Sequence, residues 1–197
     1  MANRFMIAVH FISTHFITLC WVSFIVVWIV SAFSVKPTTE RQSWTGKLAT
    51  FAFLTLTFML LLEKIPWWGI NTRIWPMGRA LRITCCIITF MGLVVSIWSR
   101  LSLGANWSAT VTYREGHELI QSGPYRFVRH PIYTGFLLMI TGTGVNFGNI
   151  SSLGALVVAF LGTWWKLRKE EIMLARHFPD AYQRYKSHTK ALIPFVL

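Results

Sequence analysis

Long apolar runs separated by short polar stretches dominate the pattern of this chain. Each run is close to the roughly twenty residues that a helix needs to cross the hydrocarbon core of a bilayer, and together they hold more apolar surface than a small aqueous core could bury. The pattern therefore predicts an all-α, polytopic membrane protein with about five transmembrane helices. We expect these at about Phe5–Phe33, Leu48–Leu62, Leu81–Trp98, Pro131–Phe147 and Ile150–Trp165.

The stretches between and after the runs predict how the helices connect. Only Gly148 and Asn149 separate the last two runs, which predicts a tight helical hairpin. The segment from Pro66 to Met77 is rich in tryptophan, proline and glycine, as suits a loop at headgroup depth. Beyond the hairpin, apolar residues recur every three or four positions, which predicts a cytosolic amphipathic helix on the membrane surface, broken near Pro179. This stripe consists of Ile172, Ala175, Phe178, Tyr182 and Tyr185.

Composition and charge support the membrane interpretation. Hydrophobic residues make up 54% of the chain and charged residues only 13%, against about a quarter charged in soluble domains. A net charge of +12 could suit nucleic acid binding, but that needs a basic face on a soluble module, and none is visible. We interpret the basic residues as orientation signals and anchors for lipid headgroups. Most of them follow the first, third and last runs, which places the N-terminus outside and the tail in the cytoplasm.

Cysteine usage and the N-terminus add little chemistry. Cys20, Cys85 and Cys86 all fall inside apolar runs, without the spacing of a zinc site or a disulfide framework, so we expect no metal site. The first run is longer than the hydrophobic region of a signal peptide and has no clear cleavage site. We therefore expect a retained first span.

Two polar stretches, Gly104–His130 and Lys166–Thr189, hold the residues that could carry chemistry. The first ends in Arg129-His130-Pro131 at the mouth of the fourth run. Taken alone, this string fits basic side chains reaching for headgroups and a proline in the first turn of a helix.

The second polar stretch contains Glu170 and Glu171, two of only seven acids. Lys166 and Glu170 are four residues apart and could form a simple surface ion pair. If the hairpin is tight, however, the chain returns beside Arg129 and His130. An acid there could bind a cationic ligand or its hydroxyl groups.

Taken together, these strings resemble the isoprenylcysteine carboxyl methyltransferase family. The resemblance rests on Asn106-Trp107-Ser108, His117-Glu118-Leu119-Ile120, Gly123-Pro124-Tyr125, Arg129-His130-Pro131-Ile132-Tyr133, Glu170-Glu171 and Phe178-Pro179-Asp180-Ala181-Tyr182. It covers roughly Leu103–Pro194, whereas the first three runs match only in hydropathy. We expect a three-span N-terminal membrane part over residues 1–103. Residues 104–197 would form a methyltransferase core of cofactor-binding loop, hairpin and C-terminal helix.

The resemblance implies a membrane enzyme that moves a methyl group from S-adenosylmethionine, held in a cytosol-facing pocket, to a lipophilic or prenylated substrate that enters from the membrane. It also implies the residues of the cofactor pocket. These are His117, Glu118, Leu119, Ile120, Tyr125, His130, Pro131, Ile132, Tyr133 and Glu170. Backbone groups near His117 and the tyrosine edges can hold adenine, and Glu170 can accept hydrogen bonds from the cofactor's hydroxyls or ammonium. Arg129 is expected to orient this loop.

One position departs from the family pattern. The family's substrate-side arginine corresponds to Lys166, and lysine cannot grip a carboxylate with two parallel hydrogen bonds. We expect Lys166 to bind the substrate, an acceptor carboxylate or thiol of the isoprenylcysteine type that needs no general base. An amine acceptor would need one, for which His130, His117 or Glu170 are the nearby candidates.

Three other functions stay open at this point. A phospholipid N-methyltransferase would share the topology and the cofactor. A sterol-type membrane reductase would use NADPH, but Gly142-Thr143-Gly144 follows no strand and does not continue as a dinucleotide fingerprint; those glycines are better interpreted as close helix packing. A small transporter could use His10 and His15 inside the first span, although histidines five residues apart do not share a helix face.

Overall fold

The structure is a computed structural model that describes residues 2–33, 43–63, 65, 69–104 and 119–196. Within those ranges the named elements are all helical. They are α1 (Ala2–Ala32), α2 (Trp44–Leu61), α3 (Arg79–Leu103), the short 3-10 helix η2 (Gly123–Arg126), α4 (Pro131–Phe147), α5 (Ile150–His177) and α6 (Pro179–His188). The all-α prediction is therefore confirmed.

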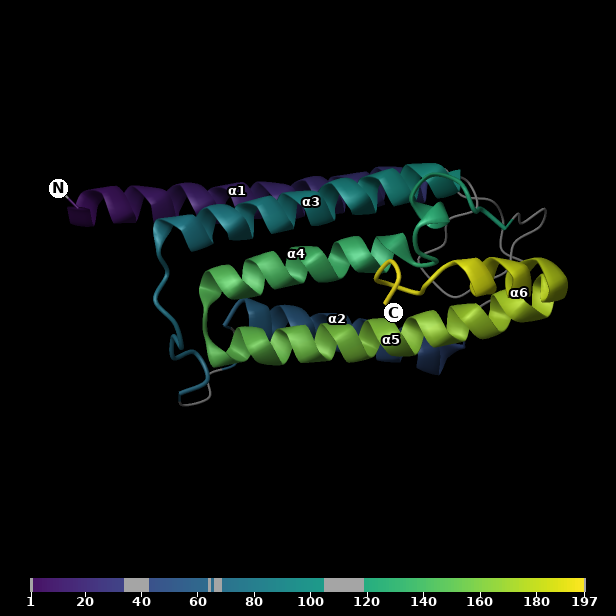
Figure 1. Ribbon diagram of the computed structural model, residues 1–197. Coiled ribbons are helices and arrows are strands. Elements are labelled where there is room, and N and C mark those ends of the chain that lie inside the picture. Colours follow the sequence, from purple (N-terminus) through teal and green to yellow (C-terminus); the bar gives the residue numbers. More distant parts are fainter. Residues whose placement is uncertain (1, 34–42, 64, 66–68, 105–118, 197) are drawn as a thin grey trace.

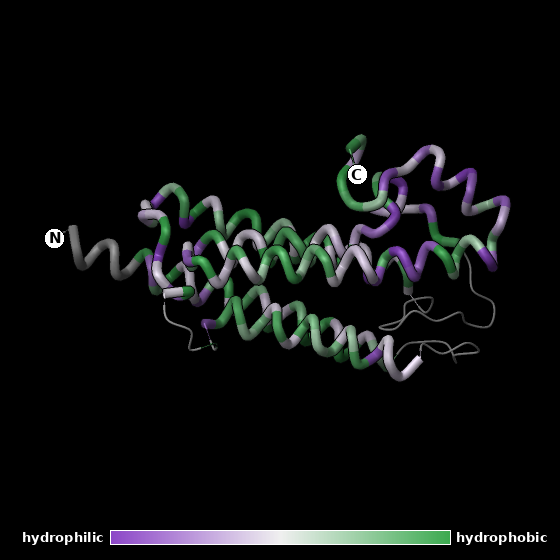
Figure 2. The backbone as a smooth tube through the Cα atoms, turned by 90° about the horizontal axis from the view of Figure 1, so that it is seen from below, coloured by the Kyte–Doolittle hydropathy of each residue, from purple (hydrophilic) through white to green (hydrophobic). Residues whose placement is uncertain are grey.

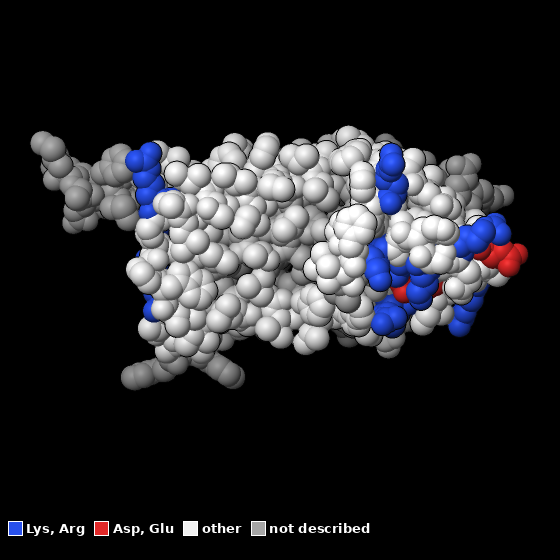
Figure 3. All heavy atoms as spheres, viewed as in Figure 1, with Lys and Arg blue, Asp and Glu red and all other residues white. Residues whose placement is uncertain are grey.

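The five long helices lie side by side along one axis, with α4 between the layer of α1 and α3 and the layer of α2 and α5 (Figure 1). η2, α6 and the C-terminal segment gather at one end of this bundle. Hydrophobic residues colour the long helices, and hydrophilic residues collect toward α6 (Figure 2). The face seen in Figure 3 carries its charged groups at the two ends and an uncharged band between them. This is the charge distribution of a protein that spans a bilayer.

Four helices are long and apolar enough to cross a membrane: α1 over Val9–Ala32, α2, α3 and α5. Large apolar side chains such as Ile25 and Leu161 stand exposed on them, as expected for surfaces that face lipid. The remaining predicted span, α4, is a helix of 17 residues packed among the others, which corresponds to about 25 Å at 1.5 Å per residue. The chain is a multi-pass membrane protein.

The hairpin between α4 and α5 forms as predicted. Gly148 adopts a left-handed conformation with φ of 70°, and Asn149 caps α5 by accepting a hydrogen bond from the backbone N–H of Ser152 over 2.9 Å. The segment that precedes α3 lies against this turn, since the backbone N–H of Ile74 donates to the carbonyl of Gly148 over 2.7 Å. The turn is thereby fixed from two directions.

Helix α5 is longer than predicted. It continues for 12 residues past Trp165, to His177, because no glycine or proline interrupts the chain before Pro179. The predicted break does occur there, between α5 and α6. Lys166, Glu170 and Glu171 consequently lie on the same rigid helix as the apolar half of the hairpin.

Glycines let α3 and α4 approach closely. A Cβ atom on Gly142 would lie 2.7 Å from the carbonyl oxygen of Cys85, and one on Gly135 would lie 2.6 Å from that of Gly92. Backbone oxygens cannot move aside as a flexible side chain can. The interpretation of Gly142 as a packing residue is confirmed, and the close α3–α4 contact fixes the start of α4, where the candidate site lies.

Candidate active site

The segment that leads into α4 is shaped by a glycine and two prolines. Gly123 has φ of 59°, and a Cβ atom there would come within 2.7 Å of Oγ of Ser102 on α3. Pro124 is the second residue of η2, and Pro131 begins α4 at a position where its missing N–H costs nothing. His130 is the residue immediately before α4 and is therefore held at the mouth of the bundle.

Glu170 of α5 is the centre of the site. The hydroxyl of Tyr133 donates a hydrogen bond to its Oε1 over 2.5 Å. Its Oε2 lies 3.5 Å from Nδ1 of His130. Lys166 stands one turn earlier on α5, with its Nζ 5.6 Å from the centroid of the Tyr133 ring. A carboxylate, a phenol, an imidazole and an ammonium group thus meet where α4 begins and the last third of α5 passes it.

A second carboxylate, that of Glu171, binds Arg129, the residue that precedes His130. Arg129 donates from Nε and from a terminal nitrogen to Oε1 of Glu171, over 2.9 and 2.7 Å. Both side chains are buried, with 8% and 6% of their surface exposed. Arg129 also donates to the backbone carbonyl of Thr189. Its contacts are those of a residue that holds the loop in place.

The chain after α6 forms the outer wall of this region. The backbone N–H of Arg129 donates to the carbonyl of Lys190 over 2.8 Å, and that of His130 to the carbonyl of Ala191 over 3.0 Å. The hydroxyl of Thr134 donates to the carbonyl of Leu192 over 2.7 Å. The C-terminal segment therefore fixes the backbone of the site directly.

Helix α6 packs on the same loop. Tyr182 and Tyr185 are buried, and the Tyr185 hydroxyl donates to the backbone carbonyl of Tyr125 over 2.5 Å. These two tyrosines of the predicted stripe therefore face the protein. That the helix lies on the membrane surface stays a prediction. Neither these tyrosines nor Thr134 and Thr189 were expected at the site. Tyr185 and Thr134 donate to backbone carbonyls 60 and 58 positions away, and the carbonyl of Thr189 accepts from Arg129, 60 positions away. The sequence carries no pattern for such contacts.

Burial and neighbouring charges shift the pKa values of His130 and Tyr125, which lie in the segment before α4. Burial lowers the pKa of His130, but hydrogen bonding and the negative charges of Glu170 and Glu171 more than offset it, so the pKa is raised from its ordinary value of 6.5. Burial, with a smaller contribution from Glu170, holds the pKa of Tyr125 well above its usual range. The site thus favours an imidazolium at His130 and a neutral phenol at Tyr125.

The structure brings together most of the predicted pocket residues that it describes. His130, Tyr133 and Glu170 form the cluster beside Lys166. Tyr125 is buried in η2. Leu119 and Ile120 are half-buried just before η2, Pro131 is buried, and Ile132 is half-buried beside Tyr133. His117 and Glu118 lie outside the described residues.

Comparisons with known proteins point to one family. A family model described as phospholipid methyltransferase matches residues 81–181. Protein-S-isoprenylcysteine O-methyltransferase A of Arabidopsis thaliana is 28% identical over 161 residues, which cover 80% of this chain and 76% of that protein. The human protein-S-isoprenylcysteine O-methyltransferase is 27% identical over 154 residues, or 75% of this chain and 51% of that protein. This chain therefore spans three quarters of the first relative and about half of the second.

A solved structure has the same fold. It is that of a eukaryotic intramembrane Ras methyltransferase, an isoprenylcysteine carboxyl methyltransferase, and it superposes with a TM-score of 0.53 at 21% sequence identity. The match covers 80% of this chain and 55% of that one. The helical bundle described above is thus an arrangement already known from a membrane enzyme.

Proposed function

Because this chain belongs to the phospholipid methyltransferase family, we propose that it transfers a methyl group from S-adenosylmethionine to a lipophilic acceptor, a carboxylate or thiol of the isoprenylcysteine type. Membership makes the chain a membrane methyltransferase; the cofactor, the acceptor and the residues that hold them are the proposal. The observation that carries it is the cluster of the buried His130 with the half-buried Glu170 and Tyr133, beside Lys166.

The chemistry of this cluster fits the cofactor. S-adenosylmethionine carries hydroxyls, an ammonium and a sulfonium, and when bound it supplies an electrophilic methyl group. Glu170 can accept hydrogen bonds from the hydroxyls or the ammonium, while the rings of Tyr125 and Tyr133 offer faces that attract a cation. Nε2 of His130 is buried and lies 3.6 Å from Oε1 of Glu171 without a hydrogen bond to any described residue, so a ligand that offers an acceptor can satisfy it.

The remaining wall of the pocket is proposed from the family resemblance. His117, Glu118, Leu119 and Ile120 would cover the adenine, and Pro131 and Ile132 would close the pocket at the start of α4. With the C-terminal segment over the loop, these residues would exclude water and align the methyl group with the acceptor. Alignment and dehydration are the main contributions a protein can make to such a displacement.

The protonation and hydrogen bonding of the candidate general bases favour an acceptor that needs no general base. His130 is disposed to be protonated, because the pKa of its imidazole is raised. Glu170 already accepts a hydrogen bond from Tyr133. A protonated amine would have to lose its proton to one of these two, or to His117, before it could react. A carboxylate or thiolate would react directly, and the ammonium of Lys166 would attract it electrostatically.

We further propose that the end of the bundle with α6 faces the cytoplasm and the N-terminus faces outward, as the distribution of basic residues predicts. Residues 104–197 would then form the catalytic core and residues 1–103 its membrane support. The acceptor would enter sideways from the bilayer, since its prenyl chain is soluble only there.

A methyl-transfer assay with two acceptors tests this proposal. The full chain in lipid nanodiscs is given radiolabelled S-adenosylmethionine with either an N-acetyl-S-farnesyl-cysteine or a phosphatidylethanolamine acceptor. We expect label in the farnesyl-cysteine ester only. Glu170→Gln should weaken cofactor binding by about tenfold or more, as for a lost hydrogen bond to a charged group, and Lys166→Gln should mainly raise KM for the acceptor.

Lys169→Gln is the matched control, because Lys169 is exposed on α5 one residue before Glu170. Its kinetics should be those of the wild-type chain. Label in phosphatidylethanolamine would assign an amine acceptor instead. A folded sample that binds no S-adenosylmethionine, measured by calorimetry, would refute the proposal altogether.

A further inference from the structure

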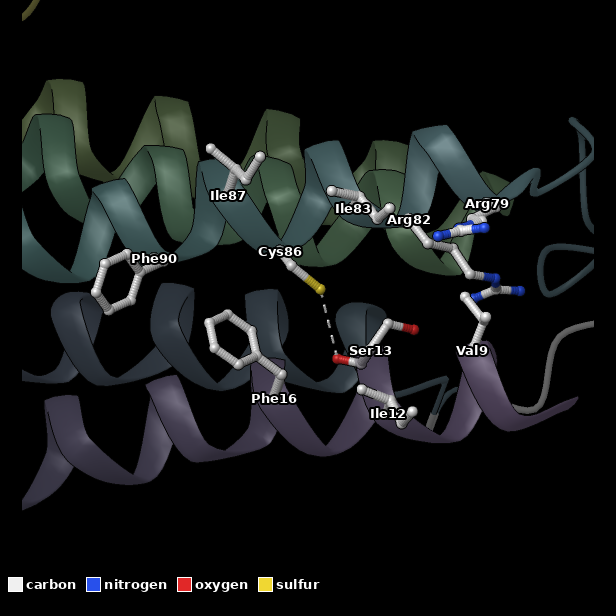
Figure 4. Close-up of a pocket in the computed structure, with 10 residues that line it drawn as sticks. All are labelled: Val9, Ile12, Ser13, Phe16, Arg79, Arg82, Ile83, Cys86, Ile87 and Phe90. Atoms are coloured by element: carbon white, nitrogen blue, oxygen red, sulfur yellow. Dashed lines mark hydrogen bonds between the residues drawn. The ribbon is translucent and has the colours of Figure 1, made fainter. Parts of the chain in front are cut away.

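An apolar groove of about 540 Å³ lies between α1 and α3 (Figure 4), at the end of the bundle opposite the candidate active site. Ile12 and Phe16 of α1 face Ile83, Ile87 and Phe90 of α3 across it. All five side chains are exposed by at least 37%. In a membrane, a groove with such walls is filled by hydrocarbon, because water has no polar partner there.

Two arginines stand at one end of this groove. Arg79 and Arg82 both line it and lie toward the first turn of α3 (Figure 4). Arg82 is 4% exposed, and one of its terminal nitrogens is 2.9 Å from Nδ1 of His10 and 3.3 Å from Oδ1 of Asn146. An imidazole nitrogen that accepts a hydrogen bond and an amide oxygen are both neutral. These two partners therefore solvate the charge of Arg82, and no carboxylate in the described part of the chain is paired with it.

The guanidinium of Arg82 also has a hydrogen-bond donor that no described residue uses. Its Nε is buried and makes no hydrogen bond to any described residue. Since Arg82 forms part of the groove wall, an acceptor at this end of the groove could satisfy that atom. An unsatisfied buried donor on a charged group costs considerable free energy, so a ligand that pairs with it gains affinity.

The start of α3 adds to the same positive region. Gly78 precedes the helix and supplies no side-chain cap. The first N–H groups of a helix lack partners within it, and together with the helix dipole they favour an anion. This feature alone would not define a site. It coincides here with two arginines and an apolar groove.

The dimensions match one leaflet of a bilayer. From Arg79 to Phe90 the groove follows α3 for 11 residues, or about 16 Å at 1.5 Å per residue. That is about half of the hydrocarbon core, which is about 30 Å thick. The arginines then lie at headgroup depth and Phe90 near the bilayer centre.

We propose that this groove binds one anionic phospholipid, whose phosphate contacts Arg79 and Arg82 and whose acyl chain lies between α1 and α3. The lipid belongs to the leaflet at the N-terminal end of the bundle. It neutralises the buried charge of Arg82 and fills the gap between the two helices, so it acts as a structural ligand and is independent of the methyl acceptor at the opposite end.

Native mass spectrometry of the full, delipidated chain in detergent tests the proposal. The probes are dioleoyl phosphatidylglycerol, dioleoyl phosphatidylcholine and the water-soluble headgroup glycerophosphoglycerol. We expect one tightly bound phosphatidylglycerol, at least tenfold weaker phosphatidylcholine, and no headgroup binding. Arg79→Gln and Arg82→Gln should each weaken phosphatidylglycerol binding by about tenfold, as for a lost hydrogen bond to a charged group.

Three further variants locate the lipid. Ile87→Trp should block the groove and abolish tight binding even if Arg82→Gln does not fold. Val157→Trp places the same ring at an exposed apolar position on α5, and Arg184→Gln removes an exposed arginine from α6; neither should change binding. Equal affinity for the two lipids, full binding by Ile87→Trp, or binding of the headgroup alone would each overturn the proposal.

Discussion

Tyr133 and Glu170 are joined by a 2.5 Å hydrogen bond that links the first turn of α4 to the last third of α5, across 37 positions of the chain. It orients the carboxylate that we propose as the main polar contact of the cofactor. Tyr133→Phe keeps the ring but removes this bond, so the carboxylate gains rotational freedom. We expect affinity for S-adenosylmethionine to fall about fivefold, in line with about 1 kcal/mol for one hydrogen bond, as measured by calorimetry. Unchanged affinity would show that Tyr133 does not position Glu170.

Substitutions at the neighbouring residues Glu170 and Glu171 should have different effects, one on cofactor binding and the other on the stability of the fold. Glu171 is paired with Arg129 in a buried contact, and removing one partner of such a pair typically costs about 3 kcal/mol or more. Glu171→Gln should therefore lower the thermal unfolding midpoint in detergent by several degrees, followed by circular dichroism. Glu170→Gln should mainly lose cofactor affinity. The assignment fails if the two variants show the reverse.

His130 should give the folded protein a pH dependence. The pKa of its imidazole is raised above 6.5 in the fold, because Glu170 and Glu171 outweigh the effect of burial. A raised pKa means that the folded state binds the proton more tightly than the unfolded state. The stabilisation is then fully present below about pH 6.5 and is lost as the pH rises through the folded-state pKa.

Unfolding midpoints measured from pH 5.5 to 9 would show this loss. His130→Asn should flatten that part of the curve, whereas His188→Asn, at an exposed position on α6, should leave it as in the wild-type chain. A wild-type slope in His130→Asn would assign the pH dependence to other groups.

Close packing between α3 and α4 can be tested at Gly142. An added methyl group would meet the backbone oxygen of Cys85 at 2.7 Å, so Gly142→Ala must push the helices apart and should destabilise the fold by about 1–3 kcal/mol. Gly78→Ala is the control, because nothing lies within 4 Å of the Cβ position there. Thermal unfolding of both variants in the same detergent decides the point; equal midpoints would mean that the contact is loose.

The helical nature of the long apolar runs follows from the sequence because it rests on local properties. Apolar runs of bilayer length become helices, since a backbone in lipid must satisfy its own hydrogen bonds. The Gly148-Asn149 turn and the break at Pro179 were predictable for the same reason: a left-handed turn and a missing N–H are properties of single residues. The end of α5 was missed because the predicted span stopped where the apolar run stops, although no glycine or proline interrupts the chain before Pro179.

The candidate active site likewise has features that could be predicted from the sequence and features that could not. The residue types of the cluster around Glu170 could be recognised from the order of motifs. The roles of Glu171, Tyr185 and the Lys190–Leu192 segment could not, because they act through backbone carbonyls and a buried ion pair formed between distant positions. The groove of Arg79 and Arg82 is likewise invisible in the sequence. Local hydropathy and backbone preferences determined the spans and turns of this protein, whereas side-chain partners far apart in the chain were decided only when the helices packed together.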